Sequence, residues 1–277
     1  PVIGHARGNT NEKQHRADST MINSLNQNGM KPSVRPHHSR LLPILLSMMV
    51  LCVGVAEAQP GDAERGERIY AARCMLCHGE EGDGMGAAAE RLNPPPRDFT
   101  MAQYKIRTTT FEEIVPADED LQRMIHDGMP GSAMPGWGDV LSEQEIQDLI
   151  VYLKTLAGLE EEEDGNLIDY GTQVAVSTES IEKGRVIFHD GDRCSECHGQ
   201  DGKGDAVKKL KDDSGYRTWP RNLTKPWTYR GSNDPRDIFA RITTGIAGTQ
   251  MPSFDDPASA KRLSIEQRWH VANYVNS

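Results

Sequence analysis

Two short motifs of the form Cys-x-x-Cys-His lie 120 positions apart in the sequence. Two thiols three positions apart lie on one helical turn, where they can form thioethers with the two vinyl groups of one haem. The histidine that follows directly can then bind the haem iron. The sequence therefore predicts two covalently attached haem c groups. The motif residues are Cys74, Cys77 and His78 in one site, and Cys194, Cys197 and His198 in the other.

The same cysteines have two other ordinary uses. Four cysteines in an exported protein could form two disulfides. A structural zinc site would instead need four ligands at short, finger-like spacing, whereas Cys74 and Cys194 lie in opposite halves of the chain. A histidine directly after each cysteine pair favours haem attachment over both alternatives.

The motifs belong to an internal repeat of about 120 residues. Residues 96–100, PRDFT, match residues 220–224, PRNLT. Further on, GMPGSAMPGW at 128–137 matches GIAGTQMPSF at 245–254. Two sequences so alike predict two domains of one fold, which we place at 59–157 and 181–277.

The repeat also identifies a second ligand for each iron. Met134 matches Met251, and each is followed directly by proline within a Gly/Pro-rich loop. A methionine is more often a core filler than a ligand, but packing does not explain why it recurs in a loop. We therefore predict that Met134 and Met251 bind iron opposite His78 and His198.

Two other side chains, Met129 and His126, are alternative candidates for the second iron ligand in the first half. Met129 also precedes a proline, but it aligns with Ile246 and is expected to be a hydrophobic residue. His126 aligns with Thr243 and is expected at the surface or in a loop.

The repeated proline segments could support the haems in two ways. A backbone carbonyl near Pro94–Pro96 or near Pro220 could accept a hydrogen bond from the Nδ1 of the ligating histidine. Arg97 and Arg221 could neutralise haem propionates, or they could simply be solvated.

The elements that position these residues are predicted to be helices. Capping boxes start a helix after Ser142 and another after Ser264. Short helices at 63–72 and 181–188 lead into the cysteine pairs, and nothing alternates with a period of two. The middle of each half is rich in glycine and proline, so we expect long loops wrapped around the haem. The predicted fold class is all-α.

Four consecutive glutamates occur between the halves. Like charges repel one another and resist packing, so residues 158–180 are expected to be an acidic linker.

The first 58 residues have the layout of an export signal. An apolar run at 41–55 follows basic residues and precedes a small-x-small cleavage site at 56–58. We therefore expect a signal peptide at 30–58 and a periplasmic protein. An uncleaved anchor is the alternative, and it alone would give membrane contact. Residues 1–29 precede Met30 and are expected to be a non-native upstream segment.

Composition narrows the class of partner. The 277-residue chain has a formal net charge of −10, which disfavours nucleic acid as a partner. Acidic surface charge can steer encounters with a basic patch on a redox protein, or it can simply maintain solubility.

With these motifs placed, residues 61–277 resemble the class I cytochrome c superfamily twice over. The resemblance rests on CMLCH and CSECH, and on MPGW and MPSF. It implies an all-α fold in which terminal helices cross at Gly66 and Tyr152, and at Gly184 and Tyr274. It also implies periplasmic electron transfer between respiratory redox partners. The second half further resembles cytochrome subunits or donors of respiratory oxidoreductases, including some molybdoenzymes.

The main functional alternative is a di-haem enzyme, peroxidase-like or thiosulfate-oxidising. Such an enzyme needs an exchangeable iron ligand or a special one such as cysteinate. Both halves keep a methionine, and downstream of the signal segment every cysteine lies in an attachment motif. We therefore expect an electron carrier without catalytic residues, or an electron-transfer subunit of a larger complex.

Overall fold

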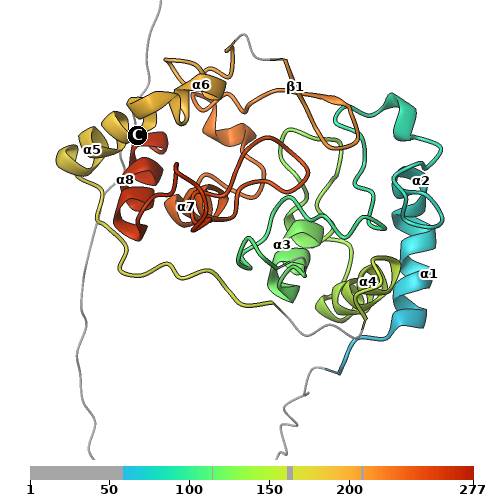
Figure 1. Cartoon of the computed structure of the whole chain (residues 1–277). Helices are drawn as coiled ribbons and strands as arrows, with labels where there is room; N and C mark the ends of the chain where they lie inside the picture. The colour runs from blue at the N-terminus through green and yellow to red at the C-terminus, as the bar shows by residue number, and fades with distance from the viewer. Residues whose placement is uncertain (1–58, 114, 161–164, 207–208) are drawn as a thin grey trace, which may run out of the picture. The chain divides into compact units, whose positions relative to one another are not determined.

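Within the described residues, each half of the chain has the same order of four helices in the computed structural model (Figure 1). The first half contains α1 (Ala63–Arg73), α2 (Met75–His78), α3 (Asp118–Asp127) and α4 (Glu143–Leu156). The second contains α5 (Thr178–His189), α6 (Ser195–His198), α7 (Pro235–Thr244) and α8 (Ile265–Val275). Three short 3-10 helices are η1 (Ala89–Arg91), η2 (Asp190–Asp192) and η3 (Pro226–Thr228). The antiparallel strands β1 (Leu210–Lys211) and β2 (Arg217–Thr218) form a small hairpin. The predicted all-α fold class is confirmed.

The structure describes residues 59–277 except 114, 161–164 and 207–208. These residues belong to one compact unit. The expected upstream segment at 1–29 and signal peptide at 30–58 lie outside the described residues. Within the described ranges, no helix is both long enough and apolar enough to span a bilayer.

The terminal helices of each half cross at a glycine. A Cβ added to Gly66 would lie 2.1 Å from the carbonyl oxygen of Asp148, and one on Gly184 would lie 2.0 Å from that of His270. Helix α1 packs against α4, and α5 against α8. No larger side chain fits between backbones this close. Tyr152 and Tyr274 flank the two crossings, as the resemblance implied.

Capping explains where the terminal helices begin. Ser142 and Glu145 form the predicted capping box of α4, and Ser264 and Gln267 form that of α8. The helices expected before the cysteine pairs are α1 and α5, which extend the predicted ranges slightly at their ends. These predictions are confirmed.

The long loops predicted for the middle of each half are partly wrong, because α3 and α7 lie there. Helix α7 begins at Pro235, and the carboxylate of the preceding residue, Asp234, accepts a hydrogen bond from the N–H of Arg236. Helix α3 follows Ala117 and has three acidic residues in its first turn, where they complement the helix dipole. Both helices bury apolar side chains at helical spacing.

Each half has its own hydrophobic core. The first is built on α4, with Ile146, Leu149 and Ile150 almost fully buried against Tyr70 of α1. The second contains Trp269 of α8, which stacks on Phe239 of α7 at 4.4 Å between ring centroids. Two separate cores are what a repeat of two domains requires.

The ends of the segment expected to be a linker pack onto the two cores. Leu159 is buried in the first core. Ile168 is buried in the second, where Tyr170 also stacks on Phe239. The Trp269 Nε1 donates to the carbonyl oxygen of Tyr170 at 2.8 Å. Residues 161–164, which include three of the four consecutive glutamates, lie outside the described residues.

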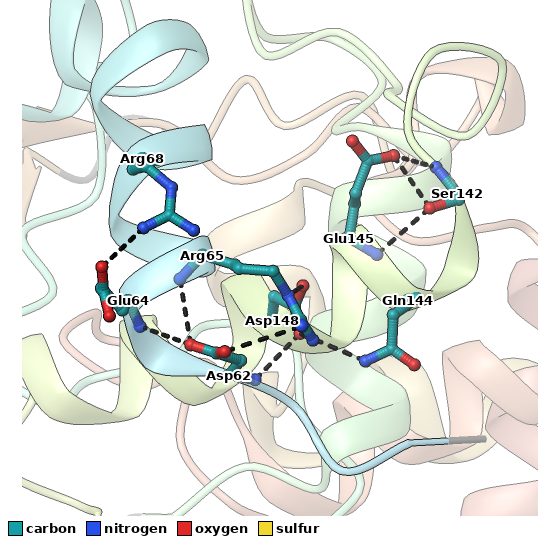
Figure 2. Close-up of polar contacts among 8 residues, drawn as sticks. All are labelled: Asp62, Glu64, Arg65, Arg68, Ser142, Gln144, Glu145 and Asp148. Carbon is teal, nitrogen blue, oxygen red and sulfur yellow. Dashed lines mark hydrogen bonds and ion pairs between the residues drawn. The ribbon is translucent and has the colours of Figure 1, made fainter.

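The two crossings differ in their polar chemistry. In the first half, the Asp148 carboxylate accepts two hydrogen bonds from Arg65, at 2.7 and 2.9 Å, and one from the backbone N–H of Asp62 (Figure 2). In the second half, Ser180 lies 2.8 Å from the His270 Nδ1 and accepts from Asn273. An ion pair in one half is thus replaced by a buried hydroxyl–imidazole–amide network in the other.

We predict that Asp148→Asn destabilises the protein at neutral pH. The Asp148 side chain is 1% exposed, and its hydrogen bonds from Arg65 lower its pKa to about 2. Because the pKa lies below its unfolded value, the stabilisation is present above about pH 4 and is lost as the pH falls towards 2. Arg65 is 39% exposed, so we expect a loss of about 1–2 kcal/mol. Urea unfolding at pH 7 and near pH 2 measures it.

The matched control is Glu64→Gln in the same region. Glu64 pairs with Arg68 at 2.8 Å, but both side chains are largely exposed (Figure 2). Its removal should change the urea midpoint little. An Asp148→Asn deficit that is equally large at both pH values would contradict the prediction.

Candidate haem sites

Helices α2 and α6 hold the two Cys-x-x-Cys-His motifs. Cys74 ends α1 and caps α2, so the motif continues directly from a helix that is fixed in the core. Cys194 caps α6 in the same way. All four motif cysteines are half-buried free thiols, which contradicts the disulfide alternative. Among the described residues, no three His, Cys, Asp or Glu side chains are grouped as a metal ion would require.

Burial sets the protonation of the first cysteine in each motif. It raises the pKa of Cys74 to about 11 and that of Cys194 to about 12. Both groups are therefore neutral thiols at physiological pH in the described fold. Apolar surroundings of this kind suit a thioether, which carries no charge.

Each motif histidine is oriented by a backbone carbonyl. His78 Nδ1 lies 3.0 Å from the carbonyl oxygen of Arg97, and His198 Nδ1 lies 3.0 Å from that of Arg221. A carbonyl only accepts, so Nδ1 carries the proton and Nε2 keeps its lone pair for a metal. Burial lowers the pKa of both histidines and so favours the neutral ring. The expected carbonyl near Pro96 and Pro220 is confirmed, one residue further along the chain.

Aromatic side chains surround the first motif. Phe99 stacks on the His78 ring at 4.6 Å between centroids. The buried hydroxyl of Tyr70 donates to the carbonyl oxygen of Gly79, directly after His78, at 2.7 Å. In the second half, Leu223 occupies the position of Phe99, and its N–H donates to the Gly202 carbonyl as that of Phe99 does to Gly82.

The methionine loops have one hydrogen-bond pattern. The Met129 N–H donates to the Met134 carbonyl at 3.1 Å, and the Ile246 N–H donates to the Met251 carbonyl at the same distance. In the first loop the Ser132 hydroxyl donates to the Met129 carbonyl, and in the second the Thr249 hydroxyl donates to the Ile246 carbonyl. The structure thus confirms that Met129 aligns with Ile246. Met134 and Met251 are both half-buried, each in the same half as its motif.

The competing histidine lies away from this arrangement. His126 is the penultimate residue of α3, its side chain is 55% exposed, and it pairs with Asp127 at 2.6 Å. Its predicted surface position is confirmed.

Two family models match the chain, one in each half. "Cytochrome C oxidase, cbb3-type, subunit III" matches residues 61–153. "Cytochrome c" matches residues 181–277.

Curated relatives and a solved structure agree with these matches. Cytochrome c55X of Paracoccus denitrificans is 34% identical over 113 residues, which are 39% of this chain and 91% of that protein. The cbb3-type cytochrome c oxidase subunit FixP of Sinorhizobium medicae is 26% identical over 203 residues. That match covers 72% of this chain but only 57% of FixP. A chain of the Kuenenia stuttgartiensis reducing HAO-like protein complex Kustc0457/Kustc0458 superposes with a TM-score of 0.72 and 35% identity, covering 79% of this chain and 97% of that one.

The helical fold, the repeated motif and these similarities define a haem-attaching electron-transfer protein. The chain belongs to the cytochrome c family and contains two cytochrome c domains in tandem.

The supporting carbonyls suggest a test of the loops that carry them. Gly84 and Gly204 both have positive φ, near +75°, and both lie against the proline segment of their half. A Cβ on Gly84 would lie 3.1 Å from the Pro96 carbonyl oxygen, but one on Gly204 would lie 2.4 Å from that of Pro220. We predict that Gly84→Ala costs about 1–2 kcal/mol through backbone strain, and that Gly204→Ala costs more, about 3 kcal/mol.

Urea unfolding of the two variants measures the difference. Gly84→Ala is the internal control, because it shares the strained backbone but not the severe overlap. Equal losses in the two variants would show that the overlap at Gly204 is relieved without cost.

Proposed function

We propose that the chain is a periplasmic di-haem c-type cytochrome that carries electrons between respiratory redox partners through two His/Met-ligated haems. One observation supports this proposal above the others: both halves present the same pair of features, an oriented histidine after two thiols and a methionine loop with identical backbone hydrogen bonds.

The described residues fit haem c. The thiols of Cys74 and Cys77 are free to become thioethers, and the Nδ1 hydrogen bond of His78 leaves Nε2 as a ligand. Met134 would supply the opposite ligand. In the second site these roles belong to Cys194, Cys197, His198 and Met251. When bound, haem c supplies a one-electron Fe(III)/Fe(II) couple. The protein residues would hold it, and the backbone carbonyls of Arg97 and Arg221 fix the imidazole tautomers.

The methionine loops favour a carrier over a catalyst. A thioether opposite histidine fills the sixth position of an iron and leaves no open site for peroxide or a sulfur substrate. The free thiols are also accounted for, since each belongs to an attachment motif. No side chain is then available in the described part of the chain as a cysteinate ligand of the thiosulfate-oxidising kind.

A permanent place in a complex is the second candidate. The names of FixP and of the HAO-like protein complex describe a subunit and an assembly, respectively. This chain would then pass electrons to or from one fixed partner. Purification of the native protein distinguishes the two: a carrier elutes at its own mass, whereas a subunit elutes with a partner of defined stoichiometry.

Export is part of the proposal. The signal sequence at 30–58 would deliver the chain to the periplasm, where haem c is attached. N-terminal sequencing of the mature protein tests cleavage after Ala58, and an intact N-terminus in the membrane fraction would favour the anchor instead.

We predict that both haems are low-spin with thioether ligation. Met134→Ala and Met251→Ala should each remove about half of the thioether-to-iron absorption band at the red end of the oxidised spectrum, because each removes one of two ligands. Met129→Ala is the matched control, since Met129 aligns with a hydrophobic residue and should leave the band intact. A spectrum unchanged by both ligand variants would disprove the assignment.

We also predict negligible peroxidase turnover by the intact protein. The measurement is hydrogen peroxide consumption by the fully reduced and half-reduced forms. Met134→Ala or Met251→Ala should raise it by opening an iron. Rapid consumption by the unmodified protein would instead support the enzyme alternative.

A further inference from the structure

The two cytochrome domains meet along a seam of specific polar contacts. Arg123 of α3 pairs with Asp237 of α7 at 2.6 Å, and both side chains are mostly buried. Arg241 of α7 donates to the carbonyl oxygen of Arg107 at 2.7 Å. These contacts bring the segments that follow each haem motif close to the opposite domain.

Four cations, two from each domain, gather along this seam: Arg97, Lys105, Arg221 and Arg230. A Cβ on Gly131 of the first domain would lie 3.1 Å from the Arg221 Nη1 of the second. A Cβ on Gly231 would lie 3.7 Å from Ile106, so the residues next to Arg230 and Lys105 are in contact.

The positive charges of the group act on the ionisation of two of its members, Arg230 and Lys105. Burial, with the positive charges of Arg221 and Arg97, lowers the pKa of Arg230 to about 10. Burial, Arg97 and Arg230 lower the pKa of Lys105 to about 8, although Asp212 and Asp213 act in the opposite direction. Like charges this close repel one another unless an anion lies between them.

The negative charge of Asp212 raises the pKa of both Arg97 and Lys105, but Asp212 does not form a close ion pair with either. Among the described residues, no carboxylate lies within 4.0 Å of any of the four cationic groups, which are all half-buried. The Nε of Arg230 is fully buried and has no hydrogen-bond partner. An orphaned guanidinium N–H beside three other cations indicates a ligand with several acceptor oxygens. The cluster is also unusual for a chain whose net charge is −10.

The cluster lies beside both motif histidines. The backbone carbonyl of Arg97 accepts from His78, and that of Arg221 accepts from His198. A haem bound at either histidine would have two propionates, and carboxylates are the groups that a guanidinium fork binds best.

We propose that Arg97, Lys105, Arg221 and Arg230 form one carboxylate-binding cluster shared by the two domains, which takes propionates from both haems and so couples the two redox centres. This inference rests on the proposed function. The cluster would hold the carboxylate edges of both haems at the seam. Removing a cation from one domain should then change the midpoint potential of the haem in the other domain.

Redox titration of the holoprotein, followed by absorption, tests the proposal with Arg230→Gln. Removing a cation weakens the repulsion that the oxidised, more positive iron experiences, so the oxidised form is favoured and both midpoint potentials should fall. The titration has two one-electron steps, one for each haem. Met251→His alters only the second haem and therefore shows which step belongs to it. Arg230→Lys keeps the charge and should restore both potentials. Lys105→Gln, in the first domain, should also lower both midpoint potentials. It replaces Arg230→Gln in the test if the Arg230→Gln protein does not fold with its haems.

Arg185→Gln is the matched control. Arg185 lies on α5 and pairs with Glu182 on an exposed surface, so its loss should move neither potential. A fall confined to one haem in Arg230→Gln, with two low-spin haems present, overturns the shared cluster and leaves the proposed function standing. Fewer than two haems per chain overturns both. If the wild-type potentials change when phosphate replaces chloride at equal ionic strength, the occupant is a free anion, and the propionate assignment is wrong.

Discussion

The contact between two helix backbones determines where the cofactor chemistry can take place. Gly66 lies against the carbonyl of Asp148, and this crossing fixes α1 on α4. A single residue, Cys74, separates the end of α1 from the start of α2, so the crossing also fixes the position of the thiols and of His78. The same holds at Gly184, where α5 leads through η2 into the second motif. The absence of a side chain at two positions thus governs the placement of both sites.

The halves keep this geometry while changing the chemistry around it. At the first crossing, a buried carboxylate is neutralised by Arg65. At the second, the Ser180 hydroxyl bonds with the His270 imidazole and accepts from the Asn273 amide, and the other ring nitrogen of His270 lies 3.4 Å from the Glu266 carboxylate. A buried polar group needs a partner, but the partner can be a charge or a dipole. The distance between backbones leaves no such choice, because any Cβ would overlap a carbonyl oxygen.

Much of the arrangement was predictable, because the two halves of the chain can be aligned with each other. The capping boxes at Ser142 and Ser264 and the alignment of Met129 with Ile246 follow from local patterns that the sequence displays. The crossing glycines were implied by the resemblance to class I cytochromes c. Helices α3 and α7 were missed because the glycine and proline around them outweighed a short amphipathic pattern, although Asp234 before Pro235 is a helix-start signal. Lys105 and Arg230 were missed for another reason. Their proximity arises only when two domains meet, and no pattern within one repeat contains it.

The segment before α5 determines where the second domain can be separated from the first, and how much sequence a domain duplication must include. Tyr170 stacks on Phe239, and its carbonyl receives the indole N–H of Trp269, while Val174 receives the amide of Asn273. The second half therefore needs an N-terminal strap that lies upstream of its first helix. A fragment that begins at Thr178 would keep every helix of the repeat yet leave Trp269 and Asn273 without these acceptors. The stable domain is therefore longer than the segment that runs from its first helix to its last. A fragment, or a copy made by gene duplication, must include the residues before α5 to remain stable.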